Sequence, residues 1–368
     1  MRPAITSVGP LLPQIGKDMK LSESTQGILS SLPLVAFALV SPLVPRFSKR
    51  LGIERAVVLA LIFLSIGTVI RSYGGPNGLW LGTIIIGSAI TFGDVLIPTI
   101  IRRDYKGNIS LATSIYAGCI GGGAALASGV AVPLGNLLGW QGALAFWALP
   151  VALVGALWIF RLTNQNPITE EIIETEQVSE TPVWKQSGAW MLTIMMATQC
   201  TLFFTLVNWL PTVEISRGTA PVQTGIHLFI FQIFGIASGF LVPMLMGNRN
   251  NYALATVVSS ITFLVGVVGI QFLPNLMMLW IVIAGSGCGM TLTAVLSLIS
   301  IRGRAHHETT RLSGMVQSIG YLFAATGPLI FGFLGEHTNG WNASLTFISI
   351  VAILQVIVAI PAGKKELV

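Results

Sequence analysis

Long apolar runs alternate with short polar and charged stretches along the whole of this chain. A helix needs about 20 apolar residues to cross the hydrocarbon core of a bilayer, and most of the runs reach that length. The alternation therefore predicts twelve membrane-spanning helices. They are expected at residues 1–15, 26–47, 56–73, 79–101, 110–134, 140–160, 188–211, 222–246, 252–272, 276–300, 312–333 and 341–360. The first run is shorter than the rest and begins as though inside a helix, so this helix is expected to be truncated at its N-terminal side.

The composition agrees with a protein that lies in lipid. Hydrophobic residues account for 53% of the 368 residues and charged residues for 9%, whereas an ordinary soluble domain has roughly 25% charged residues. The mean hydropathy of the chain is +0.79. The net charge of +6 does not indicate a nucleic-acid partner, because the basic residues lie in short clusters between apolar runs. Cys119, Cys200 and Cys288 each lie within an apolar run, which predicts neither a disulfide framework nor a metal site.

The placement of Lys and Arg predicts the orientation of the helices. If the chain starts on the inner side, the inner loops carry fifteen basic residues and the outer loops carry four, namely Lys17, Lys20, Arg71 and Arg217. Cytoplasmic loops of membrane proteins are enriched in Lys and Arg. Both termini are therefore expected in the cytoplasm.

The one long polar segment divides the predicted helices six and six. We expect an N-terminal six-helix bundle over residues 1–160, a cytoplasmic linker over residues 161–187 and a C-terminal six-helix bundle over residues 188–368.

Short motifs recur between the two predicted halves. Leu43-Val44-Pro45 returns 198 positions later as Leu241-Val242-Pro243, and Gly139-Trp140 returns 201 positions later as Gly340-Trp341. A repeat of six helices keeps its orientation in the membrane, so the halves are expected to be related by an axis along the membrane normal. A substrate cavity is then expected between them.

Several longer motifs carry a resemblance to a known family. The most specific are Arg2-Pro3 with Thr6 and Gly9-Pro10-Leu11-Leu12 in the first span, Trp209-Leu210-Pro211 in the seventh, and Ser313-Gly314-Met315-Val316-Gln317-Ser318-Ile319-Gly320-Tyr321 in the eleventh. In these motifs the chain resembles the major facilitator superfamily, and within it the cyanate permeases and 2-nitroimidazole transporters. The resemblance implies an all-α polytopic membrane fold and a secondary active transporter that works by alternating access in the bacterial inner membrane, as a monomer and without a cofactor. The expected solute is small and polar or anionic, with proton coupling as a further expectation.

The loop between the second and third spans matches only part of the superfamily's pattern. In the family this loop closes the cytoplasmic side and carries an acidic residue beside basic ones. Here Arg46, Lys49 and Arg50 keep the basic positions, whereas Pro45 takes the place of the acid. The resemblance assigns the three basic residues to a cytoplasmic gate, and a plain positive-inside anchor explains them as well.

Ionised residues inside the predicted spans are the first candidates for a site, because burying them in lipid is costly and they usually face a cavity. Arg2 lies ~15–20 Å from the outer end of its span and Asp94 lies ~22 Å from Leu79, at about 1.5 Å per residue. Both are therefore expected near the middle of the membrane, where they could meet. They form either a substrate-binding and proton-coupling pair or a purely structural ion pair.

Uncharged polar and aromatic residues extend the candidate site. Gln199 offers two donors and an acceptor to a polar substrate, or it forms a hydrogen bond between helices. His227 and Gln232 match polar positions of the family, but they point about 140° apart on a helix, so only one is expected to face the cavity. The remaining candidates come from the family motifs or from an expected aromatic wall around a flat ligand. Trp209 is explained equally well as an aromatic residue at the membrane–water interface. They are Thr6, Tyr116, Trp209, Gln317 and Tyr321.

Two enzyme-like interpretations fail on spacing. The chain has no GxxxxGK[ST] phosphate loop, and His307-Glu308-Thr309-Thr310-Arg311 has Arg where a zinc-protease helix has its second His. No enzymatic activity is therefore expected. Two alternatives to a transporter for small anions stay open: a multidrug-type efflux pump for small heteroaromatics, and a non-transporting membrane sensor on the same fold.

Overall fold

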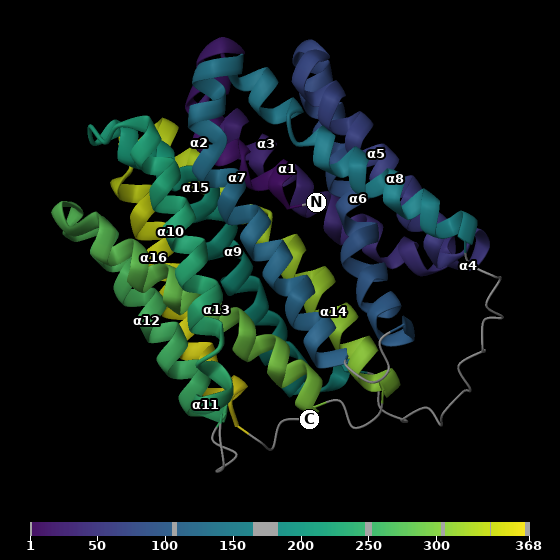
Figure 1. Cartoon of the computed structure of the whole chain (residues 1–368). Helices are drawn as coiled ribbons and strands as arrows, with labels where there is room; N and C mark the ends of the chain where they lie inside the picture. The colour runs from purple at the N-terminus through teal and green to yellow at the C-terminus, as the bar shows by residue number, and fades with distance from the viewer. Residues whose placement is uncertain are drawn as a thin grey trace.

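The computed structural model describes residues 2–104, 109–164, 183–246, 252–302, 306–338 and 340–364. Within these ranges the regular secondary structure is helical, without a strand (Figure 1). The first eight helices are α1 (Pro3–Thr6), α2 (Val8–Asp18), α3 (Glu23–Val40), α4 (Val44–Leu51), α5 (Ile53–Tyr73), α6 (Gly75–Asp104), α7 (Ile109–Ala145) and α8 (Ala148–Asn164). They are followed by α9 (Ser187–Ser216), α10 (Pro221–Gly239), α11 (Val242–Met246), α12 (Tyr252–Phe272), α13 (Met277–Arg302), α14 (His306–Ala324), α15 (Thr326–His337) and α16 (Asn342–Ala362).

Each predicted span falls on one helix or on two consecutive helices. In the described ranges, ten continuous helical stretches are long and apolar enough to cross a membrane. One of them, Gly118–Leu162, is 45 residues long and contains the sixth predicted span and most of the fifth. The first predicted span is instead the short pair α1 and α2. The prediction of an all-α polytopic membrane protein is confirmed.

The recurring sequence motifs occupy matching backbone positions. Gly139 and Gly340 have φ angles of 71° and 150°, which only glycine adopts without strain, and each directly precedes a recurring Trp. Proline is the second residue of both α4, which begins at Val44, and α11, which begins at Val242. At the start of a helix the missing N–H of proline has no intrahelical partner to lose. The motifs therefore place the same turn and the same helix start in both parts of the chain.

Helices α5, α6 and α8 lie at one side of the molecule and helices α10, α12 and α16 at the other (Figure 1). The most extensive contacts between early and late helices are those of α3 with α14 and α15, of α7 with α10, and of α2 with α9. At the last of these contacts a methyl group on Gly9 would lie 2.1 Å from the main-chain oxygen of Val207. Only glycine fits this approach, which gives the Gly9-Pro10 motif a packing role.

The end of the molecule where α2 turns into α3 is closed by contacts between early and late helices. The backbone N–H of Ser24 donates to Glu336 Oε2 at 2.8 Å. One turn further along α3, a methyl group on Gly27 would meet the main-chain oxygen of Pro328 at 2.7 Å. Helices α3 and α15 are thus in direct contact at this end.

Candidate functional site

Arg2 and Asp94 form an ion pair between the N-terminal end of α1 and the middle of α6. Arg2 Nη2 lies 3.0 Å from Asp94 Oδ2. The two side chains keep 17% and 24% of their surface exposed, so neither is fully enclosed by protein. The Arg2 guanidinium also lies 5.6 Å from the centre of the Phe37 ring, within the range of a cation–π contact. The structure therefore brings together the two ionised residues that the sequence placed at the same depth.

Two tyrosines approach this pair from other helices. Tyr321 on α14 interacts with the Arg2 guanidinium, and Tyr116 on α7 interacts with the Asp94 carboxylate. The Tyr321 ring makes edge contacts with Phe37 and Phe204, at centroid distances of 5.4 and 6.4 Å. Aromatic groups from α3, α7 and α14 thus lie beside one ion pair, with Phe204 of α9 behind Tyr321, an arrangement that suits a small flat or anionic ligand.

A chain of hydrogen bonds leads from α1 through α7 to α10. Thr6 Oγ1 donates to the Ala124 carbonyl at 3.2 Å, and Ser128 Oγ shares its proton between the carbonyls of Ala124 at 3.1 Å and Thr6 at 3.3 Å. The Thr6 carbonyl is free to accept because Pro10, four residues later, has no N–H. Gln232 Nε2 then donates to Ser128 Oγ at 2.9 Å. Gln232 therefore links a late helix to the segment that carries Arg2.

Gln199 is buried and its amide is used by neighbouring helices. Its Nε2 lies 2.8 Å from the Cys288 carbonyl and 3.1 Å from Cys288 Sγ, and its Oε1 accepts from Gln355 Nε2 at 3.1 Å. These bonds join α9, α13 and α16. Of the two interpretations of Gln199, they favour a hydrogen bond between helices over contact with a substrate.

His227 pairs with an acid that the sequence analysis missed. His227 Nδ1 lies 2.5 Å from Glu214 Oε2, and the Glu214 side chain has no exposed surface. The predicted seventh span ended at Pro211, whereas α9 continues through this proline to Ser216 and carries Glu214 into the protein. The acidic residue after the apolar run was the available signal.

Trp209 and Gln317 lie in different surroundings. Trp209 is fully buried, donates from Nε1 to the Pro328 carbonyl at 3.0 Å and stacks near Phe331 and Trp341. This position is inside the contact between α9 and α15 and does not face lipid. Gln317 is partly buried, donates to Ser313 Oγ at 2.8 Å and lies one turn before Tyr321 on the same face of α14.

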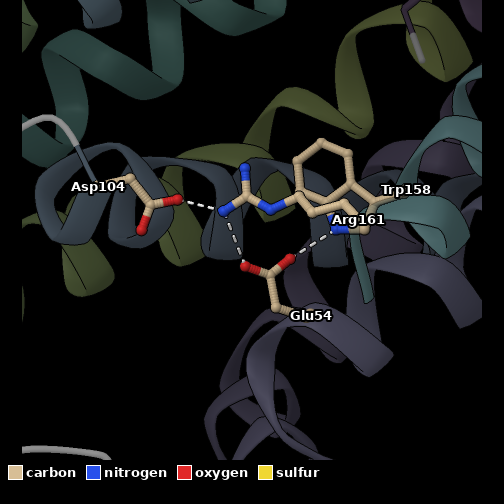
Figure 2. A network of polar contacts seen from close by, with 4 residues as sticks. All are labelled: Glu54, Asp104, Trp158 and Arg161. Atoms are coloured by element: carbon tan, nitrogen blue, oxygen red, sulfur yellow. Dashed lines mark hydrogen bonds and ion pairs between the residues drawn. The ribbon is translucent and has the colours of Figure 1, made fainter. Parts of the chain in front are cut away.

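The three basic residues assigned to a gate, Arg46, Lys49 and Arg50, are exposed on α4. A more highly connected polar cluster lies nearby, where α5 begins and α6 and α8 end (Figure 2). Arg161 Nη2 contacts Glu54 Oε1 at 3.1 Å and also binds Asp104, while Trp158 Nε1 donates to Glu54 Oε2 at 2.7 Å. The Arg161 guanidinium lies over the Trp158 ring. From the sequence, Arg161 was expected as the first residue of the cytoplasmic linker 161–187, whereas it lies in α8.

The sequence placed Arg71 in an outer loop, but in the structure it lies inside the protein. Helix α5 runs to Tyr73, and Arg71 is 2% exposed inside the protein. Its Nη1 donates to the Ala4 carbonyl at 2.6 Å. A second cation therefore contacts the α1 segment, two residues from Arg2, and Arg2 is not the only basic residue within the spans.

Comparison with known proteins gives a consistent result. A family model described as Major Facilitator Superfamily matches residues 3–320. The chain is 34% identical to the uncharacterized transporter YycB of Bacillus subtilis, over all of this chain and 91% of that protein. It is 33% identical to the 2-nitroimidazole transporter of Escherichia coli, over all of this chain and 93% of that protein.

A more distant relative and a solved structure agree with these matches. Identity to the cyanate transport protein CynX of Escherichia coli is 25%, over 93% of this chain and 89% of that protein. The crystal structure of a D-xylose-proton symporter superposes with a TM-score of 0.81 at 14% identity, covering all of this chain and 96% of that one. This structural likeness concerns the fold alone.

Proposed function

This chain belongs to the Major Facilitator Superfamily, and we propose that it is a secondary active transporter which moves one small polar or anionic solute by alternating access. The relatives named above are transporters, one for 2-nitroimidazole and one for cyanate. The observation that carries the proposal for an anion is the partly open Arg2–Asp94 pair among aromatic side chains.

The chemistry of the pair suggests how binding and proton movement are linked. An entering anion competes with Asp94 for the Arg2 guanidinium. A carboxylate that loses its cation in a poorly hydrated site is more stable when protonated. One anion and one proton then occupy the site together, and its net charge matches that of the empty site.

The closed end of the molecule fits one state of an alternating-access cycle. We assign this end, with the Ser24–Glu336 contact, to the outer side of the bacterial inner membrane, with both termini in the cytoplasm. The assignment rests on the excess of Lys and Arg in the loops of the opposite side. The Gln232–Ser128 bond joins an early to a late helix and is a contact that opening of this end has to break.

A second candidate function is efflux of small heteroaromatic molecules. The specific observation in its favour is the aromatic cluster of Phe37, Tyr321 and Phe204, of which Phe37 lies against the Arg2 guanidinium, since flat rings pack well against such faces. Uptake of an anion and export of a heteroaromatic differ in the sign of the response to an imposed pH gradient.

Flux into liposomes tests the proposal. Purified protein is reconstituted, and uptake of cyanate and of 2-nitroimidazole is measured with and without a pH gradient. We expect saturable flux of one of them, lost in Arg2→Gln and kept in Lys17→Gln, which removes an exposed cation of α2. Absence of saturable flux for a range of small solutes would favour a sensor, and unchanged flux in Arg2→Gln would remove Arg2 from the binding site.

A further inference from the structure

The Arg71 guanidinium is buried with part of its hydrogen-bonding capacity unused. Nη1 donates to the Ala4 carbonyl, whereas Nε and Nη2 have no hydrogen-bond partner. In the described part of the chain Arg71 takes part in no ion pair. A cation inside a membrane protein needs a counter-charge or polar partners, and one carbonyl oxygen supplies only part of this.

Arg71 lines a small cavity. Ser30 from α3, Thr83 from α6 and Asn208 from α9 line it together with apolar side chains. The volume open to the centre of a water molecule is about 20 Å³, enough for one or two waters or one small ion. The cavity is too small for a second side chain, so any further partner of Arg71 has to be a small molecule or ion.

A second residue that lines this cavity also has an unused donor. The Ser30 hydroxyl is buried and has no hydrogen-bond partner. Buried donors without acceptors are rare and unfavourable in native proteins. Two residues from different helices that line one cavity thus have unsatisfied donors, which indicates an acceptor between them.

The geometry of the unused atoms specifies the shape of that acceptor. The N–H groups of Nε and Nη2 lie on one edge of the planar guanidinium and point in parallel, a fork that matches two coplanar oxygens. Water satisfies such donors one at a time but brings no charge. A singly charged planar oxyanion satisfies both donors and neutralises the cation.

We propose that the cavity beside Arg71 and Ser30 is a second anion-binding site, separate from the Arg2–Asp94 pair, that takes one small planar oxyanion such as nitrate or formate. The proposal rests on the geometry of Arg71 and does not require the transport function proposed above. The site is joined to the first through α1, since Arg71 holds the carbonyl of Ala4, two residues from Arg2.

Binding of nitrate, formate and chloride to purified protein in lipid nanodiscs tests the proposal. Calorimetric titrations are made on the wild type and on Arg2→Gln, which removes the other site. We expect one saturable nitrate or formate ion to remain in Arg2→Gln, preferred over spherical chloride by about tenfold or more, the size of one charge-assisted hydrogen bond. Arg71→Lys keeps the charge but lacks the fork, so this preference should disappear.

Adjacent serines supply a matched pair of variants. Ser30 and Ser31 are both buried hydroxyls without partners, but only Ser30 lines the cavity. Ser30→Ala should weaken nitrate binding about threefold or more, again on the scale of one hydrogen bond, and Ser31→Ala should leave it unchanged. The proposal is overturned if nitrate and formate do not bind to Arg2→Gln, if Arg71→Lys keeps the preference for nitrate, or if the two serine variants behave alike. Because no flux is measured, these results do not depend on whether the protein transports either ion.

Discussion

Glu214 Oε2 lies 2.5 Å from His227 Nδ1, and the other carboxylate oxygen of Glu214 is buried without a hydrogen-bond donor. The contact joins the end of α9 to the first turns of α10. Each residue therefore relies on the other for its main polar contact in this region.

This dependence predicts a non-additive effect on stability. Glu214→Ala and His227→Ala should each lower stability by about 1–3 kcal/mol, because each leaves a buried polar group unmatched. The double variant should cost less than the sum, since it removes both partners together. Thermal denaturation of purified protein in detergent measures all three. Strictly additive losses would show that the pair has no coupling energy.

The Arg2–Asp94 pair predicts how transport depends on protons. Asp94→Asn should keep anion binding or tighten it, because the competing carboxylate is gone, and it should abolish the dependence of binding on pH. Flux measurements with an imposed pH gradient give the decisive comparison. Accumulation of solute against its gradient by Asp94→Asn would assign proton coupling to another group.

The proposed membrane topology, with the segment between α8 and α9 in the cytoplasm, predicts from which side of the membrane a cysteine in that segment can be labelled. A single cysteine introduced at Glu174, which lies in the sequence between α8 and α9 and outside the described residues, should resist an impermeant reagent in intact cells. The native Cys119 is exposed and has to be replaced first, for example by Ser. Labelling in broken cells serves as the control. Rapid labelling in intact cells would reverse the assigned topology.

Arg161 predicts a clear difference between a cation held in a polar cluster and an exposed one. Arg161→Lys should destabilise the protein by about 1–2 kcal/mol, because Lys cannot reproduce the planar contacts with Glu54, Asp104 and the Trp158 ring. Arg46→Lys on the exposed face of α4 is the matched control and should be neutral. Equal melting temperatures for both variants would remove the structural role of the cluster in Figure 2.

Gln199 provides a test between packing and substrate contact. Its amide bonds to Cys288 and Gln355 predict that Gln199→Ala lowers stability by about 1–3 kcal/mol. If the prediction of substrate contact holds instead, affinity falls by roughly 0.5–3 kcal/mol while expression and melting temperature stay near normal. Titration calorimetry and thermal denaturation of the same preparation separate the two outcomes.

The sequence predicts features that lie deep within apolar runs better than features at their ends. Asp94 interrupts a long apolar stretch and Arg2 precedes a shorter one, so their depth could be estimated from the helical rise alone, and the structure pairs them. Arg71 and Glu214 lie near helix ends, where a charged residue also marks the start of a loop. Hydropathy does not distinguish a buried charge at a helix end from a solvated one.

The sequence also does not determine how each helix is rotated about its own axis. Periodicity in a span that is apolar on all sides does not show which face meets which neighbour. The partners of Gln199 and Gln232, on α13, α16 and α7, depend on packing between helices far apart in the chain. The recurring motifs did locate equivalent turns, because a glycine with positive φ before a Trp is a local requirement.

Pro10 has a consequence for how the Arg2 segment is held. An alanine at this position would supply a main-chain N–H four residues after Thr6, in competition with Ser128 for the same carbonyl oxygen. The segment from Arg2 to Thr6 would then gain continuity with α2 and lose an attachment to α7. No hydrogen bond of Pro10 to Arg2 or Asp94 is seen among the described residues. Pro10 nevertheless favours attachment of the segment from Arg2 to Thr6 to α7 over its continuation as the first turns of α2.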